Sequence, residues 1–308
     1  MIWSFTTGRM LRRCPRQWFY KAVFAKSQSK DPRRREAYLL SKLQTISGWR
    51  GQIVDSVLSD FVVAELNAGR RPTLRAAIAK ARALFNEQRT FGVAHRLREP
   101  DLVPSQAGPA FAAFFKVEYG EPIASAEFDQ AWVDIERALR VIWRHSDLRD
   151  IVRGGRRLVA QRNLLFDHFG AKVRAVPDLI VFFEDRPPLI IDWKVHSFGT
   201  RDSGDQLTTY AIALARTPPH VDFVTSGKRW NAEDVELIEA QLIVDSFRKH
   251  PLSAAAVAQA EERIAAGISA IQLACGGRDA AELTADDFPT ARNPQTCTAC
   301  PYRKICWN

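Results

Sequence analysis

The sequence has no apolar run of the roughly 18 residues that a membrane-spanning helix needs, so we expect no membrane segment. Its first residues reach a basic cluster early and lack the apolar core and the cleavage site of a signal peptide. Cysteine is scarce, with five in 308 residues, and without a secretory signal these cysteines favour metal or cluster chemistry over disulfides. We therefore expect a cytoplasmic protein.

Internal repeats, low-complexity tracts and a Walker-type Gly-Lys-Ser/Thr motif are also absent. The missing motif excludes a nucleotide-hydrolysing motor of the P-loop type within this chain. Hydrophobic residues make up 46% and charged residues 26%, which are the proportions of a globular protein with a sizeable core. These proportions exclude a disordered or collagen-like chain.

Basic charge is concentrated near the N-terminus. Residues 1–50 contain 12 Lys and Arg but only two acidic residues, a local charge of +10 against +9 for the whole chain. Eight aromatic residues lie among them: Trp3, Phe5, Trp18, Phe19, Tyr20, Phe24, Tyr38 and Trp49. Such a segment can bind phosphates and stack on unpaired bases. The alternative is that the aromatic side chains belong to the core and the charges face solvent.

The hydrophobic periodicity predicts a mixed α/β protein. We divide the chain into four parts: first core helices over 1–68, a helical insertion over 69–154, a central α/β core over 155–250, and a C-terminal helix with cysteines over 251–308. Within the core, the pattern predicts strands over 157–167, 172–184 and 189–196, and a helix over 205–215. It also predicts long helices over 233–249 and 252–274.

Two aspartates interrupt apolar strands on either side of the turn at residues 185–188. Asp178 follows Pro177, and Asp192 is followed by Trp193 and Lys194. Because residues two apart point to the same face, Asp192 and Lys194 share a face, and hairpin pairing brings Asp178 beside Asp192. Two carboxylates at the edge of a buried sheet repel each other. A Mg²⁺ or Mn²⁺ ion, which prefers hard oxygen ligands, would remove that conflict.

Further polar residues occur in the order that a shared site requires. Gln206 and Tyr210 are spaced i, i+4, so they face the same side of the helix after the hairpin. Upstream, Asp55 places an acid on an otherwise apolar helix face. Each residue alone is more simply explained as an exposed polar group, but that explanation weakens for the ordered set.

This ordered set resembles the PD-(D/E)XK nuclease superfamily, specifically its RecB-like branch. The resemblance covers about residues 155–225 and the helix of Asp55, and its one departure is Asp55, where such nucleases often have His or Glu. It implies a restriction-endonuclease-like mixed central sheet flanked by helices, and metal-dependent cleavage of phosphodiester bonds.

The resemblance also implies roles for individual residues. Asp55, Asp178 and Asp192 would bind Mg²⁺ or Mn²⁺, and the main-chain carbonyl of Trp193 adds a ligand. Lys194 would orient or activate the attacking water and stabilise the pentavalent phosphorane. Gln206 and Tyr210 would position the nucleic acid or the lysine.

The remaining cysteine pattern lies at the two ends of the chain. Cys297, Cys300 and Cys306 form C-x2-C-x5-C near the C-terminus, and Cys14 lies near the N-terminus. Four thiolates can hold a structural zinc ion or an iron–sulfur cluster, although zinc ribbons usually have two C-x2-C knuckles and this chain has one.

The cysteine pattern resembles the iron–sulfur subset of RecB-like nucleases, namely the AddB nuclease domain and the CRISPR-associated RecB-like exonucleases. In these proteins one cysteine precedes the nuclease core and three follow it. The resemblance implies a 4Fe–4S cluster that staples the termini together. Cys275 falls outside this pattern, and we expect it to be a buried helical thiol.

From these residues we expect a DNA nuclease, in particular an exonuclease on single strands or DNA ends. It would serve DNA repair, recombination or CRISPR and phage defence. Two alternatives stay open: a DNA-end-binding subunit with little cleavage of its own, and a module that works with a helicase or integrase partner.

Overall fold

The computed structural model describes residues 2–97, 104–195, 203–218, 220–223 and 228–307. The chain forms two compact units, each assembled from separate stretches of sequence. One unit comprises Met1–Thr45, Gln88–Ile123 and Arg263–Asn308, and the other comprises Ile46–Glu87 and Ala124–Glu262. Among the described residues, no helix has the length and apolar character that crossing a bilayer requires.

The second unit is built on a mixed five-stranded sheet with the order β2-β5-β6-β7-β8. Its strands are β2 (Arg157–Ala160), β5 (Leu179–Phe182), β6 (Leu189–Lys194), β7 (Glu236–Gln241) and β8 (Ser246–Lys249). β6 and β7 pair in parallel, and the other neighbours pair antiparallel. All four residues of β5 are buried, as expected for a strand covered on both faces.

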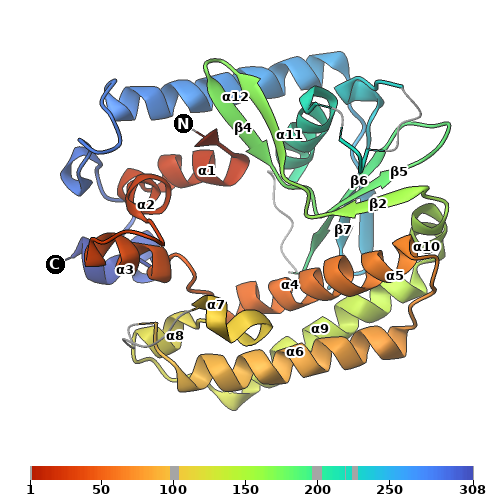
Figure 1. The fold of residues 1–308 in the computed structure, drawn as a ribbon, viewed down its shortest axis with the longest axis horizontal. Helices are drawn as coiled ribbons and strands as arrows, with labels where there is room; N and C mark the ends of the chain where they lie inside the picture. Colours follow the sequence, from red (N-terminus) through yellow and green to blue (C-terminus); the bar gives the residue numbers. More distant parts are fainter. Residues whose placement is uncertain (1, 98–103, 196–202, 219, 224–227, 308) are drawn as a thin grey trace. The chain divides into compact units, whose positions relative to one another are not determined.

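Helix α11 (Ser203–Arg216) connects the two parallel strands, as a crossover connection requires, and packs on β6 and β7. β3 (Leu164–His168) and β4 (Ala171–Ala175) form a hairpin that also contacts α11 (Figure 1). A short 3₁₀ turn, η4 (Ala232–Asp234), precedes β7.

Three helices of this unit, α4 (Ile46–Ser56), α6 (Leu74–Ala94, as far as Glu87) and α9 (Ser125–Arg144), share an aromatic core. The unit also contains the π-helical segment η2 (Val57–Val63), α5 (Ala64–Asn67) and α10 (Ser146–Arg153). The fully buried Trp49 of α4 packs on Phe85 of α6, with ring centroids 4.8 Å apart. Phe85 in turn meets Trp132 of α9 edge-on at 5.5 Å. Figure 1 shows these three helices running alongside one another.

The structure confirms the position of most of the predicted elements, divides two of them and contradicts one. The expected strands over 157–167 and 172–184 are each broken in two, giving β2 with β3 and β4 with β5. β6 begins where predicted, and His196 at the predicted end lies outside the described residues. The helix expected over 233–249 is wrong, because this segment forms β7 and β8. The helix expected over 252–274 is α12 (Ala254–Cys275).

The other unit brings both ends of the sequence together. It contains β1 (Ile2–Trp3), α1 (Phe5–Arg13), α2 (Pro15–Phe19), the π-helical η1 (Tyr20–Phe24), α3 (Pro32–Leu40), α7 (Pro104–Ala107), η3 (Gly108–Ala110), α8 (Phe115–Glu118), η5 (Ala285–Asp287), α13 (Pro294–Thr298) and α14 (Arg303–Cys306). Phe19 stacks on Phe288 with centroids 5.1 Å apart, and Tyr20 stacks on Tyr302 at 5.5 Å.

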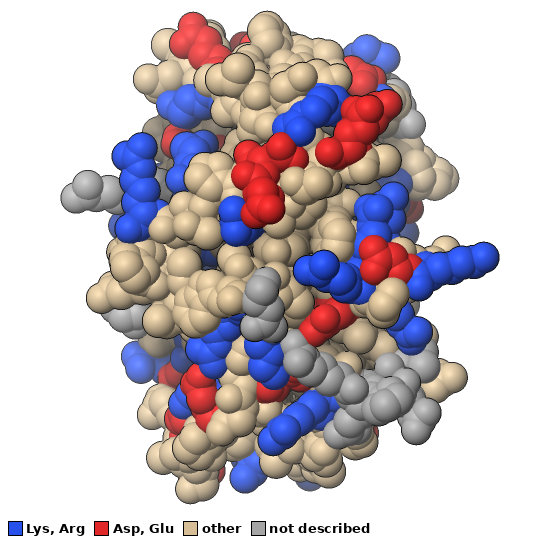
Figure 2. All heavy atoms as spheres, turned by 90° about the vertical axis from the view of Figure 1, so that its left-hand side faces the viewer, with Lys and Arg blue, Asp and Glu red and all other residues tan. Residues whose placement is uncertain are grey.

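These contacts decide what the N-terminal aromatic residues do. Trp3, Trp18, Phe19, Tyr20 and Trp49 are all buried in the core. These five are therefore not available to stack on bases, in agreement with the alternative interpretation, whereas Phe5, Phe24 and Tyr38 are half-buried. On the face drawn in Figure 2, Lys and Arg side chains occur singly and in small groups with Asp and Glu among them.

Candidate active site

The two hairpin aspartates lie opposite each other at one end of the sheet. Leu179 pairs with Ile191 in the antiparallel register of β5 and β6, so the next step of that register places Asp178 opposite Asp192. The backbone N–H of Trp193 donates to Asp178 Oδ2 at 2.9 Å. Asp192 is 1% exposed, so its carboxylate is almost completely removed from bulk water.

Lys194 connects this pair to the following helix. Its Nζ forms an ion pair with Asp192 and donates to Gln206 Oε1 at 3.2 Å. Gln206 Nε2 donates in turn to the Tyr210 hydroxyl at 2.5 Å. The i, i+4 spacing on α11 makes this last contact possible, because residues four apart share one side of a helix. The result is a continuous polar chain from Asp192 to Tyr210.

Asp55 joins the cluster from α4, two residues before the π-helical segment η2 begins. Its Oδ1 accepts from the ring Nε1–H of Trp193 at 3.0 Å and from Gln161 Nε2 at 2.7 Å. The same Gln161 amide also donates to Asp178 Oδ1 at 3.0 Å. One amide group therefore lies between the two carboxylates.

The electrostatics of the cluster are those of crowded, poorly solvated acids. Burial raises the pKa of Asp178 well above its ordinary value, and the charges of Asp192 and Asp55 raise it further. Burial also raises the pKa of Asp55, although hydrogen bonds from Trp193 and Gln161 oppose this. The pKa of Tyr210 is raised by burial and by the two hairpin aspartates, so the tyrosine is a neutral hydrogen-bonding group.

These carboxylates fit a divalent cation by their chemistry. Mutually repelling hard oxygen ligands are the donors that Mg²⁺ and Mn²⁺ prefer. The carbonyl of Lys194 accepts from Leu242 N on the β7 side, so alternation along the strand turns the Trp193 carbonyl toward the β5 side, where Asp178 lies. In the described part of the chain, no group of three or more His, Cys, Asp or Glu side chains is placed to hold a metal ion. The Asp192 carboxylate is turned to Lys194 instead.

The structure adds residues that no pattern in the sequence indicates. Gln161 has a φ of +49°, which breaks the predicted strand and turns its side chain into the cluster. Glu239 of β7 pairs with Asp192 in the parallel register and is completely buried. His250 lies 3.0 Å from its carboxylate, and Gln241 donates to it. Gln161 follows no periodic pattern, and the predicted helix over 233–249 concealed Glu239.

Arg50 is a third such residue, and it supports the end of β6. Its guanidinium forms an ion pair with the buried Asp134 of α9 and donates to the Val195 carbonyl at 2.5 Å. It therefore ties α4, which carries Asp55, to the strand that carries Asp192 and Lys194.

The four patterned cysteines lie together in the other unit. Cys14, Cys297, Cys300 and Cys306 all line one cavity, and none is in a disulfide. Cys14 lies between α1 and α2, where its Sγ accepts from Gln17 N at 3.4 Å. Burial raises the pKa of the Cys300 thiol to about 11, and the three other cysteines add to the shift. Cys275 ends α12 outside this cavity and is only half-buried, not the buried thiol expected.

The chemistry of the cavity fits a metal-containing group. The hydroxyl of Tyr302 is buried at its wall and, among the described residues, has no hydrogen-bond partner. Thiolates are the donors of zinc sites and of iron–sulfur clusters. The four cysteines that line this cavity therefore have the donor chemistry of either group.

The sequence pattern of the PD-(D/E)XK nuclease superfamily matches residues 2–307, nearly the whole chain. The chain belongs to the PD-(D/E)XK nuclease superfamily. Its members are nucleases that typically use divalent metal ions. The sequence contains Pro177-Asp178 and Asp192-Trp193-Lys194, which match in type and order the residues after which the superfamily is named.

Solved structures provide two distant similarities. SSO0001 is 14% identical with a TM-score of 0.30, and the match covers 73% of this chain and 94% of that one. A candidate exonuclease from Eubacterium rectale is 11% identical with a TM-score of 0.35, and the match covers 92% and 93%. No curated protein matches the chain in sequence.

Proposed function

We propose that this protein is a metal-dependent deoxyribonuclease of the RecB-like branch, which degrades single-stranded DNA or DNA ends. The observation that carries the proposal is the connected cluster of Asp55, Asp178, Asp192, Lys194, Gln206 and Tyr210. Its members come from one helix, two paired strands and the crossover helix between the parallel strands.

In this proposal the three aspartates and the Trp193 carbonyl hold Mg²⁺ or Mn²⁺. The cation supplies charge neutralisation at the phosphate and a lowered pKa of the attacking water. The amide of Gln161 keeps Asp55 and Asp178 turned toward each other, since it donates to both. The Trp193 N–H orients the second oxygen of Asp178 in the same way.

In this proposal Lys194 assists proton transfer from the attacking water or stabilises the negative charge that develops on the phosphate. Its ammonium is held between the Asp192 carboxylate and the Gln206 carbonyl. From there it can stabilise negative charge on the phosphate oxygens or assist proton transfer from the water. Tyr210 fixes the Gln206 amide, so Gln206 presents its oxygen to the lysine.

For the cysteine cavity we propose a 4Fe–4S cluster held by Cys14, Cys297, Cys300 and Cys306, with zinc as the alternative. The cluster would be structural, because it ties the first helices to the last ones. The packing of Tyr20 on Tyr302 and the bond from the Tyr20 hydroxyl to the Ile305 carbonyl, 2.9 Å long, support this role.

Cleavage of end-labelled single- and double-stranded DNA by anaerobically purified protein, with Mg²⁺ or Mn²⁺, tests the proposed activity. We expect metal-dependent shortening from an end, and loss of at least about 1,000-fold in rate for Asp178→Asn, because electrostatic stabilisation of the transition state is lost. Asp167→Asn, on the exposed part of β3, is the matched control. Equal rates for Asp178→Asn and the control would refute the assignment.

A further inference from the structure

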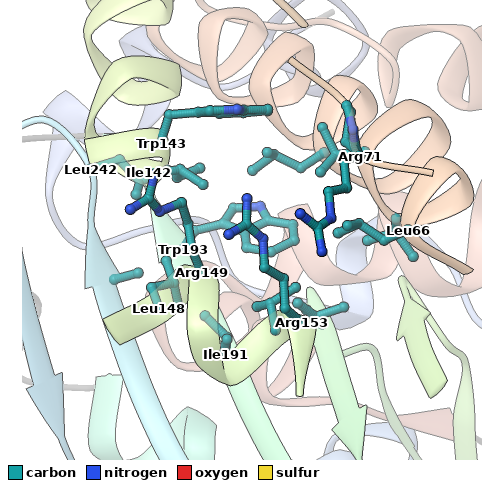
Figure 3. A pocket seen from close by; sticks show the side chains of 17 residues that line it. Leu66, Arg71, Ile142, Trp143, Leu148, Arg149, Arg153, Ile191, Trp193 and Leu242 are labelled. Carbon is teal, nitrogen blue, oxygen red and sulfur yellow. The ribbon is translucent and has the colours of Figure 1, made fainter. Parts of the chain in front are cut away.

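A separate cavity of about 90 Å³ lies in the sheet-containing unit, and none of the three aspartates is among the described residues that line it. Its floor is formed by Ile191 and Trp193 of β6 and by Leu179 of β5, and its walls include Val62, Val63 and Trp143 from the helices. Asp192 and Lys194 alternate with Ile191 and Trp193, so the cavity is on the opposite face of β6 from the proposed lysine. Figure 3 shows the side chains that line the cavity, with Ile191, Trp193 and Trp143 among them.

Three arginines surround this apolar cavity. Figure 3 shows the side chains of Arg71, Arg149 and Arg153 directed toward one another at its opening, near the ring of Trp143. Among the described residues that line the cavity there is no Asp or Glu. Arg149 Nε is buried, and within the described chain it has no hydrogen-bond partner. Three neighbouring guanidinium groups without a carboxylate repel each other, so the site is complementary to an anion.

A ligand that fits this site has an anionic group for the three arginines and a small flat ring for the apolar cavity. The planar fork of arginine suits the oxygens of a phosphate. A closed cavity of about 150 Å³ holds benzene, so this cavity of about 90 Å³ takes only part of one small flat ring, and the rest of the ring lies at its open side. Indole faces such as that of Trp143 stack well on a nucleobase. We propose that the cavity binds one nucleotide, with its base against Trp143 and Trp193 and its phosphate at the three arginines.

The proposed nucleotide site shares Trp193 with the candidate active site. The Trp193 ring lines the cavity, while its Nε1–H donates to Asp55 at 3.0 Å and its backbone N–H donates to Asp178 at 2.9 Å. A bound base therefore restrains the residue that orients two of the three aspartates. The nucleotide belongs either to the substrate strand, which rests on the proposed function, or to a free mononucleotide.

Binding is measured with the full-length protein in the absence of divalent metal, so that no cleavage occurs. The probes are a fluorescent single-stranded oligonucleotide and free dCMP. The variant Arg71→Glu/Arg153→Glu reverses two exposed charges of the site. The control Arg137→Glu/Arg229→Glu makes the same charge change at two exposed arginines outside the cavity. Leu66→Trp fills the cavity without changing charge.

We expect the site variant to bind the oligonucleotide at least about tenfold more weakly than the wild type. The slope of log affinity against log salt concentration should decrease by the amount expected for the loss of about one to two phosphate contacts. The control should change binding less than about threefold, and Leu66→Trp should weaken it as the site variant does. Loss of dCMP binding as well identifies a free nucleotide as a ligand, and loss of oligonucleotide binding alone identifies the strand. Unfolding midpoints check that each variant is folded.

Equal weakening in the site variant and its control, or unchanged binding in folded Leu66→Trp, would overturn the nucleotide site. These results are independent of the proposed nuclease activity, which is measured with metal. A wild-type protein that binds through the arginines but does not cleave DNA leaves the nucleotide site standing and refutes the nuclease proposal. A wild-type protein that cleaves DNA, but whose DNA binding is unaffected by the arginine substitutions, supports the nuclease proposal and refutes the nucleotide site.

Discussion

The side-chain amide of Gln161 links two carboxylates of the candidate active site, because its single NH₂ group donates to both Asp55 and Asp178. Without it, two carboxylates whose pKa values are already raised by burial would face each other with one donor fewer. Groups that orient metal ligands commonly contribute ten- to a hundredfold to metal affinity or activity. Gln161 is therefore a positioning residue and makes no proposed contact with the substrate.

We predict that Gln161→Ala raises the Mg²⁺ concentration for half-maximal cleavage by about tenfold or more. The rate at saturating Mg²⁺ should recover in large part, since the proposed lysine and aspartates remain. Titration of the cleavage rate with Mg²⁺ measures both quantities. Gln272→Ala, an exposed residue of α12, is the control. A variant with the wild-type Mg²⁺ requirement would show that Gln161 does not organise the aspartates.

At this scale, local patterns in the sequence indicate the residues of the cluster but not the residues that support them. The order of Asp178, Asp192, Lys194, Gln206 and Tyr210 follows from strand alternation and helical spacing, which are local. Gln161 and Arg50 act through contacts with residues far away in the chain, at separations of 106 and 84 positions. No local pattern reports such contacts.

β7 is the element whose interpretation from sequence was wrong, and the reason is physical. Its sequence, ELIEAQ, has good helix formers at most positions. Pairing in parallel with β6 overrides that preference, because the strand buries five of its six residues in the middle of the sheet. The strands at residues 179–182 and 189–194 are rich in β-branched residues, so their propensity and their environment agree.

β7 carries Glu239, whose carboxylate gives the strand a pH-dependent contribution to stability. Burial disfavours the charge, but hydrogen bonds from Gln241 and His250 outweigh this and lower the pKa of Glu239. A carboxyl with a lowered pKa in the folded chain stabilises it above its unfolded pKa of about 4.3. That stabilisation is lost as the pH falls through the lower folded value.

We therefore predict that Glu239→Gln lowers the unfolding midpoint at pH 7 by about 2–4 °C. The difference from wild type should shrink as the pH falls below about 4. Thermal unfolding followed by circular dichroism across this range measures it. Glu236→Gln, at an exposed position of the same strand, should leave the midpoint unchanged. A difference that grows toward low pH would contradict this account of Glu239.

For the whole molecule, the two compact units are not successive segments of sequence. Each combines stretches that are far apart, and one of them joins residues 1–45 to residues 263–308. Hydrophobic periodicity identifies helices and strands but not which distant stretches pack together. The cysteine pattern was the one sequence feature that related the two ends. The cavity shared by Cys14 and the three C-terminal cysteines lies where these ends meet.

We predict that Cys300→Ser protein purified anaerobically loses most of its iron and inorganic sulfide and unfolds at a lower temperature. Cys300 is buried at the shared cavity, so its loss removes one of four proposed ligands. Cys275→Ser should retain both metal content and stability, because Cys275 does not line the cavity. Zinc in place of iron in the wild-type protein would select the alternative ligand, and neither metal would contradict the four-cysteine site.

The central claim, that the cluster around Lys194 is the catalytic centre of a nuclease, is tested most directly by one comparison. Metal-dependent cleavage of end-labelled single-stranded DNA is measured under single-turnover conditions for wild type, Lys194→Ala and the surface control Lys172→Ala. We predict that the wild type and the control cleave at similar rates, while Lys194→Ala is slower by at least about 100-fold yet binds DNA normally. Cleavage by folded Lys194→Ala at the wild-type rate would contradict the claim.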